Sequence, residues 1–316
     1  MLGSVHIPLQ DIVTTLTGGT PSKSSWEYII LDYRLPKAIT ATISGGALAV
    51  SGLLMQTLFR NPLAGPFVLG ISSGASFGVA ILILASSALG ISLGAISGNW
   101  ALTIAASIGS FLVLLMVITA SARLRDTMAL LIIGLMVGSL TAALVSVLAY
   151  FSKAEELQRY IFWSFGSVGN LSWQAVGILA LCVVIGTVLA VVSLKVLNAL
   201  LLGDAYARTL GIQIKKSRLL IIIATSLLAG SVTAFAGPIA FIGLAVPHLV
   251  RQLIPSSNHR ILMPAVMLGG AVLLLLCDII ASVPYSEYML PINAITALVG
   301  APVVIWLLVR KKKLIF

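Results

Sequence analysis

The residues of this chain that could do chemistry are few and lie far apart in the sequence. Asp278 is the one carboxylate within an apolar stretch, and no Lys or Arg stands near it along the chain. An acid at membrane depth is a candidate for ion or proton transfer, although a protonated or hydrogen-bonded structural Asp is the simpler interpretation. Because coupled carriers usually hold their ion with several buried polar groups, a single Asp argues against that class.

Metal, redox and nucleotide chemistry are not indicated by the sequence. His248 lacks ligand spacing to His6 or His259, so we predict no metal site. Cys182 and Cys277 lie in apolar runs and are interpreted as small core residues without a disulfide. No phosphate-binding Gly-x-x-x-x-Gly-Lys-Ser/Thr motif is present, so any ATP must be hydrolysed by another polypeptide. The spans carry neither paired acids nor a Ser and His set, which argues against an intramembrane enzyme.

One hydrophilic segment has the pattern of a short capped helix. Asp204 is predicted to be its N-cap and Gly211 its left-handed end, with helix-favouring residues between them. Ala207, Leu210 and Tyr206 give this helix an apolar side. The pattern is compatible with packing on the membrane surface and with docking of a partner protein.

These residues must be positioned by elements that lie in lipid. The chain is 59% hydrophobic and only 9% charged, so we predict an all-α membrane protein with one domain over residues 1–316. A span needs about 20 apolar residues. The nine predicted spans are 36–59, 66–88, 98–121, 127–150, 171–195, 217–236, 239–253, 262–283 and 291–309. The break at Gly237-Pro238 separates the sixth from the short seventh.

The distribution of positive charge orients these spans. With nine crossings, fourteen of the nineteen Lys and Arg residues fall on one side, which is therefore predicted to be cytosolic. The net charge of +10 is thus explained by topology and lipid headgroups, without nucleic acid. The C-terminus and the loop 196–216 are then cytosolic, and segment 1–35 is external, with a short surface helix or a loop around Ile7 to Leu16.

Small residues recur every four positions on several spans. Such faces allow helix backbones to approach closely in lipid, and we interpret them as bundle packing. The three faces are Gly70, Gly74 and Gly78; Ala41, Gly45 and Ala49; and Gly134 and Gly138.

A series of motifs, in order along the chain, resembles the iron-chelate and vitamin B12 permease family, the FecCD type of ATP-binding-cassette importers. The motifs are Arg34–Lys37, Gly45–Gly52 with Gln56, Arg60–Ala64, Leu69–Gly74, Gly203–Gly211, Gly237–Arg251, His259–Arg260 and Gly300–Pro302. Each motif is modest alone, but together they cover residues 27 to 310 and are highly specific.

The resemblance implies the architecture and the partners. It implies a vitamin B12 permease-like bundle in a bacterial or archaeal cytoplasmic membrane, acting as a homodimer. Two ATPase subunits would bind ATP and Mg, this chain would bind no cofactor, and an external binding protein would deliver a metal chelate. The family has ten spans and this chain shows nine, so we expect an apolar segment encoded upstream of Met1, unless the first span has been lost.

The resemblance also assigns roles to residues. Gly203, Asp204, Ala205, Tyr206, Ala207, Arg208, Leu210 and Gly211 match the coupling helix that enters a groove on the ATPase. Arg34 and Lys37 match basic residues that meet acids on the binding protein. The cytosolic gate is matched by Asn61 and Leu63 and by Thr127 and Met128, while Leu157–Gly166 resembles a short external helix beside the pathway.

The chain departs from the family pattern at its external side. Members often carry a further basic residue where Ser282 stands, and Glu-Leu-Pro-Ile-Gly where this chain has Met289-Leu-Pro-Ile-Asn293. Docking of the binding protein is therefore expected to be weaker here or built differently, with Glu287 nearby. The predicted function is a non-enzymatic permease for a ferric siderophore, haem or a corrinoid. The alternative is an ion-coupled secondary carrier that acts without an ATPase.

Overall fold

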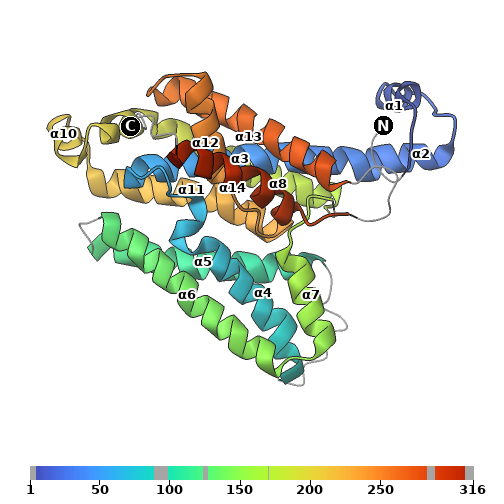
Figure 1. Ribbon diagram of the computed structural model, residues 1–316, viewed down its shortest axis with the longest axis horizontal. Coiled ribbons are helices and arrows are strands. Elements are labelled where there is room, and N and C mark those ends of the chain that lie inside the picture. Colours follow the sequence, from blue (N-terminus) through green and yellow to red (C-terminus); the bar gives the residue numbers. More distant parts are fainter. Residues whose placement is uncertain (1–4, 89–98, 124–126, 170, 283–288, 310–316) are drawn as a thin grey trace.

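The computed structural model describes residues 5–88, 99–123, 127–169, 171–282 and 289–309, and its regular elements are helices (Figure 1). The helices are α1 Leu9–Leu16, α2 Ser24–Tyr28, η1 Ile29–Arg34, α3 Leu35–Phe59, η2 Pro66–Leu69, α4 Ile71–Ala88, α5 Asn99–Arg123, α6 Thr127–Phe151, α7 Ala154–Ser164, α8 Trp173–Val192, α9 Leu194–Leu201, α10 Asp204–Thr209, α11 Ile214–Ala236, α12 Ile242–Leu253, α13 His259–Ala281 and α14 Ile292–Val309. The predicted all-α membrane fold is confirmed.

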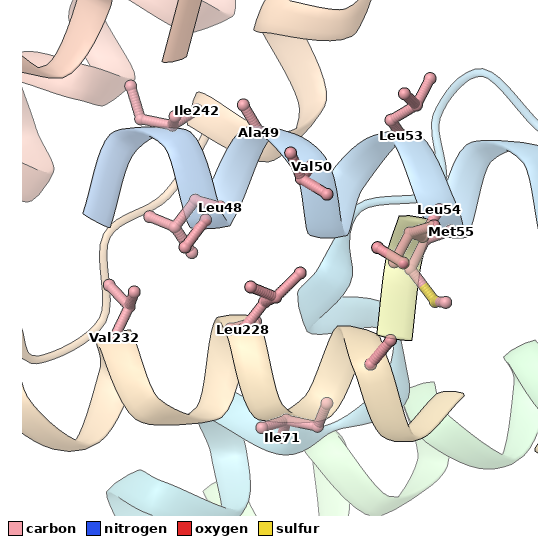
Figure 2. Close-up of a cluster of buried hydrophobic side chains, with 14 of the residues drawn as sticks. Leu48, Ala49, Val50, Leu53, Leu54, Met55, Ile71, Leu228, Val232 and Ile242 are labelled. Carbon is pink, nitrogen blue, oxygen red and sulfur yellow. The ribbon is translucent and has the colours of Figure 1, made fainter. Parts of the chain in front are cut away.

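Helix α3 is the axis of the bundle. It packs against α8, α11, α12 and α13, and its residues from Ser44 to Phe59 are all buried. Figure 2 shows Leu48 pointing from α3 toward Leu228 and Val232 of α11, with Ile71 of α4 on the far side of α11. A helix that is apolar all round must be enclosed by other helices or lipid, and α3 is enclosed by helices.

Glycines set how closely the helices approach. A side chain at Gly45 would overlap the backbone of Gly270 in α13, and one at Gly52 would overlap the backbone of Gly243 in α12. In the second group of helices, Gly74 of α4 faces Gly109 of α5 in the same way. The small-residue faces predicted from the sequence are thus packing faces, as expected for helices associating in lipid.

Among the described residues, six helices are long and apolar enough to cross a membrane, and they correspond to six of the nine predicted spans. Two further apolar helices are shorter within the described residues, at Ile71–Ala85 and Ile292–Trp306. The remaining predicted span, 239–253, begins with a non-helical stretch, and its helix α12 has 12 residues. Such a helix is about 18 Å long, so it cannot cross about 30 Å of hydrocarbon alone.

The two ends of the long molecular axis carry different surface elements. Helix α10 lies at one end, and α1 and α2 lie at the other (Figure 1). The surface helix foreseen near Leu16 exists as α1. It is held to the following turn by Asp11, whose Oδ1 accepts hydrogen bonds from Ser22 N at 2.8 Å and Ser22 Oγ at 2.7 Å. These two hydrogen bonds hold the pKa of the Asp11 carboxyl below its usual range.

Candidate coupling, gate and docking sites

Helix α10 is a short surface helix bounded by two glycines in the left-handed region. Gly203 has φ +104° before it and Gly211 has φ +77° after it, a conformation that costs glycine little. The predicted N-cap was wrong, because Gly203 occupies that position and Asp204 is the first helical residue. The Asp204 carboxylate instead forms an ion pair with Arg218 of α11, with Oδ2 and Nη2 3.2 Å apart.

The two sides of α10 differ in burial. Ala207 is buried against the rest of the protein, while Tyr206 and Leu210 keep 48% and 57% of their surface exposed. Exposed aromatic and aliphatic side chains on a six-residue helix are uncommon unless something covers them, since so short a helix is not stable alone. The helix is therefore anchored on one side and available for contact on the other.

The predicted coupling segment lies beside the first predicted gate segment. A side chain at Gly203 would come within 3.2 Å of Arg60 Nη1, and Arg60 is the left-handed cap (φ 45°) that ends α3. After this cap, Asn61 Oδ1 accepts a hydrogen bond from Leu63 N at 2.9 Å. His248 Nε2 of α12 donates to Pro62 O at 2.7 Å. The loop is thus fixed at its middle, and Leu63 is left 44% exposed.

The second predicted gate segment begins α6. Met128 is half-exposed, whereas the side chain of Thr127 lies outside the described residues. Met128 and Leu63 are thus exposed to a similar degree, 49% and 44%, in one copy of the chain.

A buried polar cluster near α10 was not foreseen from the sequence. His259, at the start of α13, lies 2.8 Å from Thr57 Oγ1 through Nε2 and 2.8 Å from Asn198 Oδ1 through Nδ1. Its backbone N also donates to Asn198 Oδ1 at 2.9 Å. Since Asn198 belongs to α9, this cluster ties α3, α9 and α13 together next to the coupling segment. The motif His259–Arg260 drew attention to His259, but the sequence did not indicate which residues His259 contacts.

At the opposite end, Asp278 does have a basic partner, contrary to the expectation from the sequence. Lys37 Nζ of α3 lies 3.1 Å from Asp278 Oδ1 of α13, with side-chain exposures of 10% and 14%. Lys37 Nζ also donates to Ser282 Oγ at 2.7 Å. In the antiparallel pair α3–α13, Lys37 and Asp278 each lie eight residues from the contact of Gly45 with Gly270, which brings them to one level.

Because Lys37 pairs with Asp278, the two predicted docking residues, Arg34 and Lys37, differ in the charge that they can offer to a partner protein. The ammonium of Lys37 is buried and neutralised within the chain. Arg34 is partly exposed, and its Nη2 donates to Val5 O of the N-terminal segment. Its Nη1 is buried without a hydrogen-bond partner among the described residues. Asn293, where family members often have Gly, accepts a hydrogen bond from Ala240 N at 3.0 Å and so supports the stretch before α12.

Comparison with known proteins agrees with this arrangement of motifs. The family model described as the FecCD transport family matches residues 1–310. The chain belongs to the FecCD transport family. It is 35% identical over 313 residues to the hemin transport system permease protein of Yersinia pestis, covering 99% of this chain and 92% of that protein. It is 40% identical over 288 residues to the vitamin B12 import system permease protein of Klebsiella pneumoniae, covering 90% and 84%.

The fold comparison points to the same class. An inward-facing structure of a putative metal-chelate type ABC transporter superposes with a TM-score of 0.81 at 32% identity, covering 96% of both chains. The FecCD chain described here is therefore a multi-span membrane permease subunit of an ATP-binding-cassette importer.

Proposed function

We propose that this permease passes a ferric siderophore, haem or a corrinoid from an external binding protein into the cytosol. It would act as a homodimer driven by two separate ATPase subunits. The relatives carry hemin and vitamin B12, and the structural neighbour is of the metal-chelate type. All three are large metal-containing molecules, which supports this substrate class without selecting one member.

The observation that carries the proposal is α10. It presents Tyr206 and Leu210 to the outside while Asp204 fastens it to α11. An apolar aromatic and an aliphatic side chain on a rigidly held helix suit insertion into a groove on an ATPase. The neighbouring segment Asn61–Leu63 would then be the cytosolic gate that responds, together with Thr127 and Met128.

At the other end, we propose that Arg34 is the basic residue of this chain that meets the binding protein. Lys37 would contribute indirectly by keeping α3 and α13 in register through Asp278. The absence of the further basic residue at Ser282 is compatible with weaker or differently built docking.

The experiment that tests the proposal separates ATP hydrolysis from transport. The permease is reconstituted in proteoliposomes with its ATPase and binding protein, and uptake and hydrolysis are measured for Tyr206→Asp and Leu210→Asp. A carboxylate in an apolar groove is costly unless it is paired, so we expect uptake to fall at least tenfold while membrane insertion stays normal. The ATPase should co-purify poorly or hydrolyse ATP without transport.

Tyr206→Phe is the matched control, because it keeps the aromatic ring, and it should retain uptake within about twofold. Full ATP-driven uptake by both Asp variants would contradict the coupling role. Uptake in vesicles without any ATPase would instead support the ion-coupled carrier.

A further inference from the structure

Two hollows on the α7 side of the bundle form one continuous feature. The outer hollow has a volume of about 480 Å³ and lies among α7, the start of α5, the start of α8 and the end of α11. The deeper hollow, about 470 Å³, follows α5, α8 and α11. Trp100, Thr103 and Phe235 line both hollows, so the two hollows are direct neighbours.

The deeper hollow is an apolar groove at membrane depth. Its floor is α11, and its sides are α5 and α8, which both pack on α11. Ile104 and Phe111 on one side and Ile178 on the other are exposed, so the groove opens toward the hydrocarbon region. The apolar lining offers water few hydrogen-bond partners, so an apolar occupant is favoured in the groove.

The dimensions of the groove fit a hydrocarbon chain. Along α5 the lining residues run from Trp100 to Leu114, which is about 21 Å at 1.5 Å per residue. An extended hydrocarbon chain can lie along a groove of this length, in contact with the apolar walls that α5, α8 and α11 provide.

The outer hollow supplies a headgroup environment. Arg159 of α7 lines it, is exposed, and makes no ion pair with any residue in the described ranges. Trp163, Trp100 and Phe162 surround the same space. Aromatic rings beside a basic side chain are typical of the level at which lipid headgroups lie, and guanidinium is well suited to bind phosphate.

We propose that this feature is a phospholipid-binding site. The lipid phosphate binds Arg159 in the outer hollow, and one acyl chain lies in the groove formed by α5, α8 and α11. This lipid fills the space between α5 and α8, which both contact α11 without packing extensively on each other. The site is independent of which chelate the permease transports.

Native mass spectrometry of the purified chain in an uncharged maltoside detergent tests the proposal. Dipalmitoyl phosphatidylglycerol is titrated, and the first bound lipid is followed. We expect Arg159→Gln to weaken this binding about fivefold, as for the loss of one basic contact. Lys153→Gln removes an equal charge from the start of the same helix outside the hollow, and it should leave binding unchanged. Dipalmitoylglycerol, which lacks phosphate, should bind the unaltered chain as weakly as the phospholipid binds Arg159→Gln.

A phospholipid with a photoactivatable group on its acyl chain locates the second half of the site. Cross-links should fall within 104–114, 178–182 and 223–231, and Ser107→Phe, which fills the groove, should remove those on α8 and α11. Equal binding by the Arg159 and Lys153 variants would overturn the proposal, as would cross-links spread evenly over the lipid-facing helices. Loss of the lipid on adding millimolar inorganic phosphate, without any cross-link in the groove, would show a simple anion site instead.

Discussion

Lys37 and Asp278 form a buried charge pair whose two members depend on each other. Each side chain would be strongly disfavoured at this depth if it were charged and alone. Together with Ser282 they are mutually satisfied, and both lie on helices whose contact is set by Gly45 and Gly270. Their main role in one chain is therefore to fix α3 against α13 at the end that carries α1 and α2.

The pair predicts unequal effects of single and double substitutions. Asp278→Asn leaves the Lys37 ammonium buried without a counter-ion and should destabilise the fold by about 3 kcal/mol. Lys37→Met combined with Asp278→Leu removes both charges and should recover most of that loss. Thermal unfolding of the variants in detergent at neutral pH measures the difference. Equal destabilisation by the single and the double variant would show that the two groups are not coupled.

Sequence reasoning identified Asp278 as unusual but could not find its partner. Lys37 precedes Asp278 by 241 positions, and only the register of two antiparallel helices brings them to the same level. The same limit applies to His259, whose partners Thr57 and Asn198 lie on two other helices. Local features were more predictable: Gly211 is the left-handed residue after α10, as its type indicated, although the start of the helix was misassigned to Asp204 as N-cap.

At the scale of helices, close backbone contacts decide where α3 lies. Gly52 and Gly243 touch through their backbones, so α12 is held against the centre of the bundle despite having only 12 residues. Phe241, the N-cap residue of α12, has the left-handed φ of 66°, and its side chain lies against Gly300 of α14. These contacts bring together motifs that lie far apart in the sequence.

The Gly52 contact predicts a large effect of a single methyl group. Gly52→Ala would place a carbon on the backbone of Gly243, and since backbone cannot move aside as a flexible side chain does, the cost should be about 3 kcal/mol. Gly177→Ala in α8 is the control, because nothing lies within 4 Å of the added carbon there. It should be neutral or stabilising by roughly 0.5 kcal/mol. Similar melting temperatures for both variants would argue against the close α3–α12 contact.

At the scale of the whole molecule, the end that carries α10 is separated from the end that carries α1 and α2 (Figure 1). Their assignment to opposite sides of the membrane comes from the positive charge, which follows the rule that Lys and Arg gather in cytosolic loops. Part of that charge, at Arg310–Lys313, lies outside the described residues. The orientation therefore stays a prediction.

Accessibility of single cysteines measures the orientation directly. In a background with Cys182→Ala and Cys277→Ala, the exposed positions Thr20 and Arg208 are each replaced by Cys in separate variants. In intact cells, a membrane-impermeant maleimide should label position 20 and leave position 208 unlabelled. After the membrane is opened, both should react. Labelling of position 208 from outside would reverse the orientation.

Helix α11 connects the two ends of the molecule as a single stiff rod. It has 23 residues and is about 34 Å long. Near one end, Arg218 forms an ion pair with Asp204 of α10. At the other end, Ala236 O accepts a hydrogen bond at 2.8 Å from Ser167 N, just after α7. Since rigid elements transmit displacement along their length, a displacement of α10 would reach the segment after α7 without refolding of α11. If α10 is the ATPase contact that we propose, α11 forms a mechanical link from that contact to the opposite end of the molecule.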